Sequence, residues 1–122
     1  DLGCVTTHVV AQYQNLSHVL VEANHDRTML AQGSYPARLK RRVGADYGHL
    51  SNEQAFELIE RIAHEQLQVV VGHVSEQNNC PDILTRAMSP LQNCVAALQL
   101  ATQSGGFDWL GSQPIRRQIS FA

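Results

Sequence analysis

The sequence predicts an α/β (α+β) fold, in which helices cover a sheet whose strands end in polar residues. The strongest strand signal is Val69-Val70-Val71, because three consecutive β-branched residues are typical of a strand buried on both faces. A second β-rich run occupies residues 18–21. Between them, residues 51–63 combine a capping pattern with an apolar stripe at helical spacing.

The first quarter of the chain predicts two short helices around the strand at residues 18–21. Thr6 or Thr7 can cap a helix that ends near Asn15. Asp26 is suited to cap a second helix over residues 27–32.

Turn and capping residues delimit the next two helices. Pro36 is suited to the first position of a helix over residues 37–43, which Gly44 ends. Ser51 and Gln54 form a capping-box pattern before the stripe of Phe56, Ile59, Ile62 and Ala63.

After the central strand the signals are weaker. Pro81 opens a helix to about Met88, where Ser89-Pro90 breaks it. Residues 98–102 favour a strand over the end of a second helix. Residues 107–110 are expected to pack back against the domain, and residues 116–122 look like a loosely attached tail.

Composition indicates one ordinary globular domain. The 122 residues are 43% hydrophobic and 16% charged, and the net charge of -2 provides no global attraction to nucleic acid or anionic membranes. No apolar run approaches membrane-spanning length and no signal-peptide pattern opens the chain, so we expect a cytoplasmic protein without a membrane partner. Three irregularly spaced cysteines argue against a disulfide framework or a thiolate zinc site and predict reduced, mostly buried thiols.

Both predicted strands end in groups able to do chemistry. Residues 18–21 lead into Glu22 and His25, and residues 69–71 lead into His73, Ser75 and Asn78. In open α/β sheets ligands bind beyond the carboxyl ends of the strands. The alternative is structural: Glu22, His25 and His73 would then only hydrogen-bond neighbouring loops.

Two further features have the same ambiguity. The cations Arg38, Lys40, Arg41 and Arg42 could contact phosphates, or they could form a solvated helix face. His49 follows a glycine just before a helix start, where a histidine can donate to an anion.

Four segments together resemble a known family. They are Asp1-Leu2-Gly3, Val21-Glu22-Ala23-Asn24-His25-Asp26, Gly48-His49-Leu50-Ser51-Asn52-Glu53 and Gly72-His73-Val74-Ser75-Glu76-Gln77-Asn78-Asn79. In this order they are similar to the carboxyl-terminal half of metallo-β-lactamase-fold hydrolases, of the YycJ/WalJ type in the tRNase Z-like phosphodiesterase branch. The resemblance covers residues 1 to about 110.

The resemblance implies a fold and a site. Residues 1–122 would be the carboxyl-terminal half of a four-layer αββα sandwich, lacking the half that carries the first metal motif. Asp1 would bridge two divalent metal ions, zinc or manganese, and His73 would be the last histidine ligand of the second metal. Glu22 and His49 would be catalytic, with His49 helping to protonate the leaving group. His25, Ser75 and Asn78 would be candidates for outer-shell or substrate contacts.

One departure limits the activity expected of the chain. The family's His-x-His-x-Asp-His motif is absent, since the six histidines all stand alone, and the start at Asp1 without methionine suggests a piece cut from a longer chain. Two ligands cannot complete even one metal site, so we expect this polypeptide alone to be inactive. The parent would be a metal-dependent hydrolase of a phosphodiester or nucleic acid, and a β-lactam substrate is poorly supported. The alternative is a non-catalytic half-fold that works through binding or assembly.

The strand pattern also predicts a partner. Val19, Val21, Val69 and Val71 share one side of their strands, while Leu20 and Val70 share the other. Helices would cover one face and leave the other as a large exposed apolar patch. We therefore expect the isolated chain either to be partly unfolded or to pair with its missing amino-terminal half or with a second copy of itself.

Overall fold

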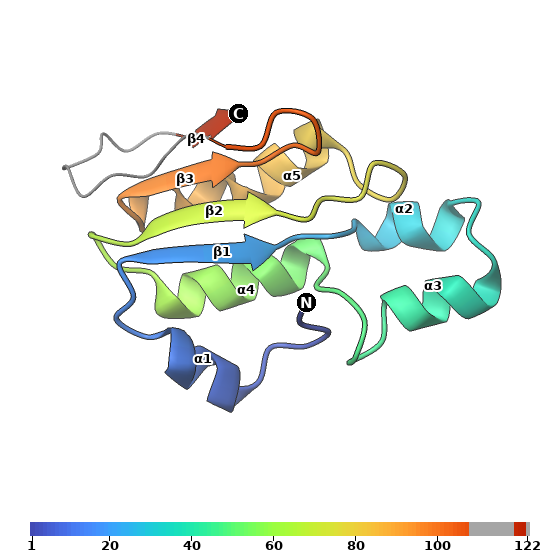
Figure 1. Cartoon of the computed structure of the whole chain (residues 1–122), viewed down its shortest axis with the longest axis horizontal. Helices are drawn as coiled ribbons and strands as arrows, with labels where there is room; N and C mark the ends of the chain where they lie inside the picture. Colours follow the sequence, from blue (N-terminus) through green and yellow to red (C-terminus); the bar gives the residue numbers. More distant parts are fainter. Residues whose placement is uncertain (108–118, 122) are drawn as a thin grey trace.

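The sheet is parallel throughout. The computed structural model describes residues 1–107 and 119–121, and its strands are β1 (His18–Glu22), β2 (Gln68–Gly72), β3 (Ala97–Leu100) and β4 (Ile119–Phe121). They pair in the order β1-β2-β3-β4, with each neighbouring pair parallel (Figure 1). The carboxyl ends of β1 and β2 therefore meet at the same edge of the sheet, which confirms the α/β prediction.

The helices follow the predicted boundaries closely. They are α1 (Thr7–Tyr13), α2 (Arg27–Gln32), α3 (Ala37–Val43), α4 (Asn52–Ile62), α5 (Pro81–Met88) and the 3₁₀ helix η1 (Ser89–Asn93). The side chains of Thr6 and Asp26 cap α1 and α2, and Ser51 with Gln54 forms the capping box of α4. Pro36 is the N-cap residue of α3, one position earlier than predicted.

The hydrophobic core lies between one face of the sheet and the helices. Val19 and Val21 of β1, Val69 and Val71 of β2, and Leu98 and Leu100 of β3 are buried against α1, α4, α5 and η1. Helices α2 and α3 instead lie beyond the carboxyl ends of β1 and β2 (Figure 1). This arrangement leaves the polar strand ends between α3 and α4.

The opposite face differs from the prediction of a large apolar patch. Leu20 is 61% exposed, as expected, but Val70 is only 2% exposed. Leu20 and Gln99 flank Val70 in the register, because β2 lies inside the sheet and β1 lies at its edge. On β1, β2 and β3, the apolar exposure of this face is therefore concentrated at Leu20.

The last part of the chain also corrects the sequence interpretation. Strand β3 ends at Leu100, and Thr102 instead bridges to Gly106. Phe107 is exposed, so it does not pack back, and residues 108–110 lie outside the described part. Residues 119–121 pair with β3 as a strand, whereas a loose tail was predicted; residues 116–118 and 122 lie outside the described part.

The cysteines are free, as predicted, but they are less buried than expected. Cys94 is exposed at the end of η1, and Cys4 and Cys80 are half-buried in loops. Within the described residues, no helix has the length and apolar character needed to cross a membrane.

Candidate metal centre

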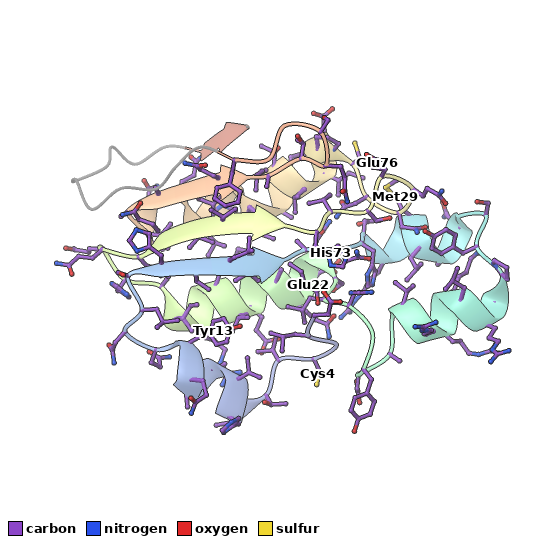
Figure 2. The ribbon with its side chains drawn as sticks, viewed as in Figure 1. Cys4, Tyr13, Glu22, Met29, His73 and Glu76 are labelled. Carbon is purple, nitrogen blue, oxygen red and sulfur yellow. The ribbon has the colours of Figure 1, made fainter. Side chains whose placement is uncertain are left out.

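Four potential metal ligands converge at the carboxyl ends of β1 and β2. Glu22 is the last residue of β1, His73 follows β2, His49 lies in the loop before α4, and Asp1 lies in the amino-terminal segment. One ligand atom of each lies within 4.8 Å of the other three. Figure 2 shows Glu22 and His73 together beyond the ends of β1 and β2.

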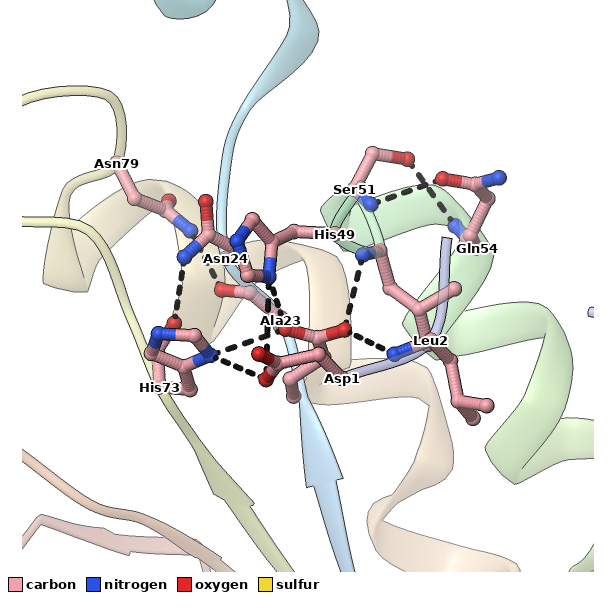
Figure 3. A network of polar contacts seen from close by, with 11 residues as sticks. Asp1, Leu2, Ala23, Asn24, His49, Ser51, Gln54, His73 and Asn79 are labelled. Atoms are coloured by element: carbon pink, nitrogen blue, oxygen red, sulfur yellow. Dashed lines mark hydrogen bonds and ion pairs between the residues drawn. The ribbon is translucent and has the colours of Figure 1, made fainter. Parts of the chain in front are cut away.

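The contacts within this group are short. Oε2 of Glu22 lies 2.9 Å from Nδ1 of His49 and 3.1 Å from Nδ1 of His73. Oδ1 of Asp1 lies 3.1 Å from Nδ1 of His73 and 3.9 Å from Nδ1 of His49. The two imidazole rings meet edge to face with centroids 4.9 Å apart, so the donor atoms surround one small volume (Figure 3).

Glu22 is the most firmly held of the four. Its Oε1 accepts hydrogen bonds from the backbone N–H groups of Leu2, at 2.6 Å, and Leu50, at 3.3 Å. Burial by itself raises the pKa of Glu22, but these two N–H groups and His49 outweigh burial, so the net pKa lies below its usual value. The carboxylate is therefore ionised and able to attract cations or protonated histidines.

His73 has an unusual backbone conformation. Its φ of 51° lies in the left-handed region, which non-glycine residues rarely adopt. The side chain of Asn24 donates a hydrogen bond of 3.0 Å to the His73 carbonyl and holds this conformation (Figure 3). Such strain is concentrated at functional sites because it aims a side chain that a regular strand would direct elsewhere.

The donor set suits a divalent metal. Two carboxylates and two imidazoles match zinc or manganese chemistry. Bonds of about 2.1 Å in a tetrahedral site place neighbouring ligand atoms about 3.4 Å apart. The four contacts between a carboxylate and an imidazole, of 2.9 to 3.9 Å, span that value, and all four ligand atoms lie within 4.8 Å of one another. The residues present therefore fit a metal, and they leave part of the site open, since the Asp1 side chain is 61% exposed.

The other predicted site residues lie around this group and outside it. His25 is buried, pairs through its backbone with Ser51 and has no hydrogen-bond partner for Nδ1. Ser75 accepts from the Asn78 N–H in the loop after β2, and both residues line a groove that includes His49 and His73. They shape the surroundings of the four donors.

The cations of α3 divide into two groups. Lys40 donates a hydrogen bond of 2.7 Å to the carbonyl of Ala31 in α2, so it ties the two helices together. Arg38, Arg41 and Arg42 are exposed. Arg42 lines a second groove, which His49 and Asp1 also border.

Sequence reasoning missed a buried asparagine pair that supports the site. The side chains of Asn52 and Asn79 exchange hydrogen bonds of 3.0 and 2.8 Å, and Asn79 also donates to the carbonyl of Ala23. This pair joins the exit of β1 to the starts of α4 and α5. An asparagine occurs in each of the three longer family-like segments, and that recurrence was the available signal.

Comparison with known proteins places the chain beside named nucleases. It is 37% identical over 89 residues to "Exodeoxyribonuclease WalJ" of Streptococcus pneumoniae serotype 2, a match covering 72% of this chain and 33% of that protein. It is 31% identical over 90 residues to "Exodeoxyribonuclease YycJ" of Bacillus anthracis, covering 73% of this chain and 34% of that protein. No protein-family model and no solved structure matches. The chain thus spans about a third of the length of the curated relatives it matches.

Proposed function

We propose that this chain forms part of a metal-dependent phosphodiesterase that hydrolyses DNA. The convergence of Asp1, Glu22, His49 and His73 at the carboxyl ends of the strands is the observation that carries the proposal. The names of the relatives support a DNA substrate.

Asp1 and His73 are the proposed metal ligands. They form the more exposed side of the group, and their ligand atoms lie 3.1 Å apart. A divalent metal bound there would activate water and stabilise charge on the phosphoryl group. The strained backbone of His73 presents its ring toward Asp1.

Glu22 and His49 form the proposed acid/base pair. The buried carboxylate of Glu22 accepts from Nδ1–H of His49, at 2.9 Å, which leaves Nε2 for a substrate oxygen. A carboxylate that orients an imidazole in this way also stabilises its protonated form. His49 can then donate a proton to the leaving oxygen of a phosphodiester.

The remaining metal ligands are proposed to come from outside this chain. Four donors, of which two act in acid/base chemistry, cannot complete a two-metal site. The exposure of Leu20 and the edge position of β1 suit packing against further structure, such as the second sheet of a four-layer sandwich. About two thirds of each relative lies beyond the matched region.

Replacement of single histidines tests these roles in the natural protein that contains this chain. His73→Ala should lose bound metal and metal-dependent DNA hydrolysis. His49→Ala should keep its metal and lose turnover by about 10² to 10⁴, the usual contribution of general acid catalysis. His8→Ala, at an exposed position of α1, is the matched control and should change neither.

Metal content and turnover must be measured on the same samples. Full metal and activity in His73→Ala would contradict the assignment of His73. Loss of metal in His49→Ala would make His49 a ligand. Folded, metal-free wild-type protein without hydrolytic activity would favour a binding module instead.

A further inference from the structure

The outer face of α3 carries a strip of arginines. With 3.6 residues per turn, Arg38, Arg41 and Arg42 lie within an arc of about 100°. All three are exposed, and among the described residues no hydrogen bond or ion pair engages their side chains. Since the whole chain has a net charge of -2, this strip is a local concentration of free positive charge.

A groove extends from Arg42, the last arginine of this strip, to the metal centre. Leu39, Arg42 and Val43 of α3 line one part of the groove, and Asp1 and His49 line another. The backbone N–H of His49 donates to the carbonyl of Val43 at 2.9 Å. The carboxyl end of α3 is therefore directly connected to a residue of the site.

Close packing fixes the position of the strip. A Cβ added to Gly3 would lie 2.0 Å from the backbone oxygen of Asp46, and one added to Gly48 would lie 2.2 Å from that of Val43. Only glycine allows these approaches. The loop after α3 is thus pressed against the amino-terminal segment that carries Asp1.

Tyr47, in this same loop, is fully exposed. Its relative exposure is 103%, and it lines the groove beside His49. An aromatic ring that offers its faces to solvent next to free arginines matches the chemistry of single-stranded nucleic acids, in which phosphates pair with cations and unpaired bases stack on aromatics. Asp46 also lines the groove, so a base fits there better than a phosphate.

We propose that Arg38, Arg41, Arg42 and Tyr47 form a binding track for single-stranded DNA next to the phosphodiester at the metal centre. This inference rests on the proposed function. The arginines would hold consecutive phosphates, and Tyr47 would stack on a base as the strand enters the groove. A duplex hides its base faces, so the track should favour unpaired DNA.

Binding without cleavage tests the arginines. The natural protein that contains this chain is titrated with a fluorescein-labelled oligothymidylate in EDTA, at several salt concentrations. Arg38→Gln/Arg42→Gln should weaken binding and reduce the slope of log K against log salt by about 1.4, because each phosphate contact to a single strand contributes about 0.7. Arg61→Gln/Arg86→Gln removes the same charge from exposed positions of α4 and α5 and is the matched control.

Tyr47 is tested by its stacking. Tyr47→Ala should weaken binding about fivefold or more with an unchanged salt slope, and Tyr47→Trp should restore it. A duplex of equal length should bind more weakly and respond little to Tyr47→Ala. The track is wrong if the arginine variant matches its control, or if Tyr47→Ala binds like wild type.

A separate measurement distinguishes this inference from the proposed function. Wild-type protein is assayed for metal-dependent hydrolysis of bis(4-nitrophenyl) phosphate, a small diester that does not need the track. If the protein hydrolyses this diester but its DNA binding does not depend on the track residues, the track alone is overturned. If DNA binding depends on the track residues but the diester is not hydrolysed, the proposed phosphodiesterase activity is overturned.

Discussion

The asparagine pair beneath the site should respond asymmetrically to mutation. Asn79 makes four side-chain hydrogen bonds: it donates to Ala23 and Asn52, and it accepts from Asn52 and from the N–H of Cys80. Among the described residues, the side chain of Asn52 makes only the two bonds of the pair, and both side chains are buried. The two residues are both asparagines, but Asn79 provides hydrogen bonds to more groups than Asn52 does.

The magnitude follows from the groups left without partners. Asn79→Ala removes the hydrogen-bond partner of three groups: the Ala23 carbonyl, the Cys80 N–H and the Asn52 amide. Each unsatisfied group should cost about 1 to 3 kcal/mol of stability. We expect a loss of about 3 to 9 kcal/mol in the free energy of unfolding. Asn52→Ala leaves Asn79 with two partners and should cost about 1 to 2 kcal/mol. In the double variant no Asn52 amide remains to lose its partner, so the double variant should be no less stable than Asn79→Ala.

Urea unfolding followed by far-UV circular dichroism measures all four proteins, in EDTA so that bound metal does not add to stability. The natural protein that contains this chain is the sample. Equal losses for the two single variants, or additive losses in the double variant, would refute this reasoning.

Three further outcomes are expected. Ser51→Ala should lower the free energy of unfolding by about 1 kcal/mol, because it removes the cap bond to the Gln54 N–H, whereas Ser51→Asp should retain most of it; thermal unfolding compares the two. Gly48→Ala should lose more than the ordinary cost of such a change, since the added Cβ would meet the backbone of Val43, and a stability equal to wild type would contradict that packing. Burial lowers the pKa of His25, so the unfolded state binds more protons and the free energy of unfolding should fall as the pH drops below about 6.5. The slope of this dependence cannot exceed about 1.4 kcal/mol per pH unit, because one group titrates. Urea titrations at pH 5 and 7.5 should show that His25→Phe flattens it.

Local signals in the sequence were sufficient for the helices and for the first two strands, but not for β3 and β4. The caps at Thr6, Asp26 and Ser51 and the stop at Gly44 act within one turn of a helix, so neighbouring residues alone specify them. The valine run of β2 was equally clear, because burial on both faces requires it. Glu22 and His73 could be singled out because polar residues that end buried strands are conspicuous.

Contacts between distant segments were decided by the tertiary structure. Asp1, His49 and His73 meet Glu22 only because parallel pairing brings the ends of β1 and β2 together and the loops before α4 and after β2 fold over them. The exposure of Leu20 and the burial of Val70 depend on edge and interior positions in the sheet, which alternation along a strand does not encode. Asn52 and Asn79 lie 27 residues apart in the sequence, and a hydrogen bond between residues that far apart produces no local sequence pattern.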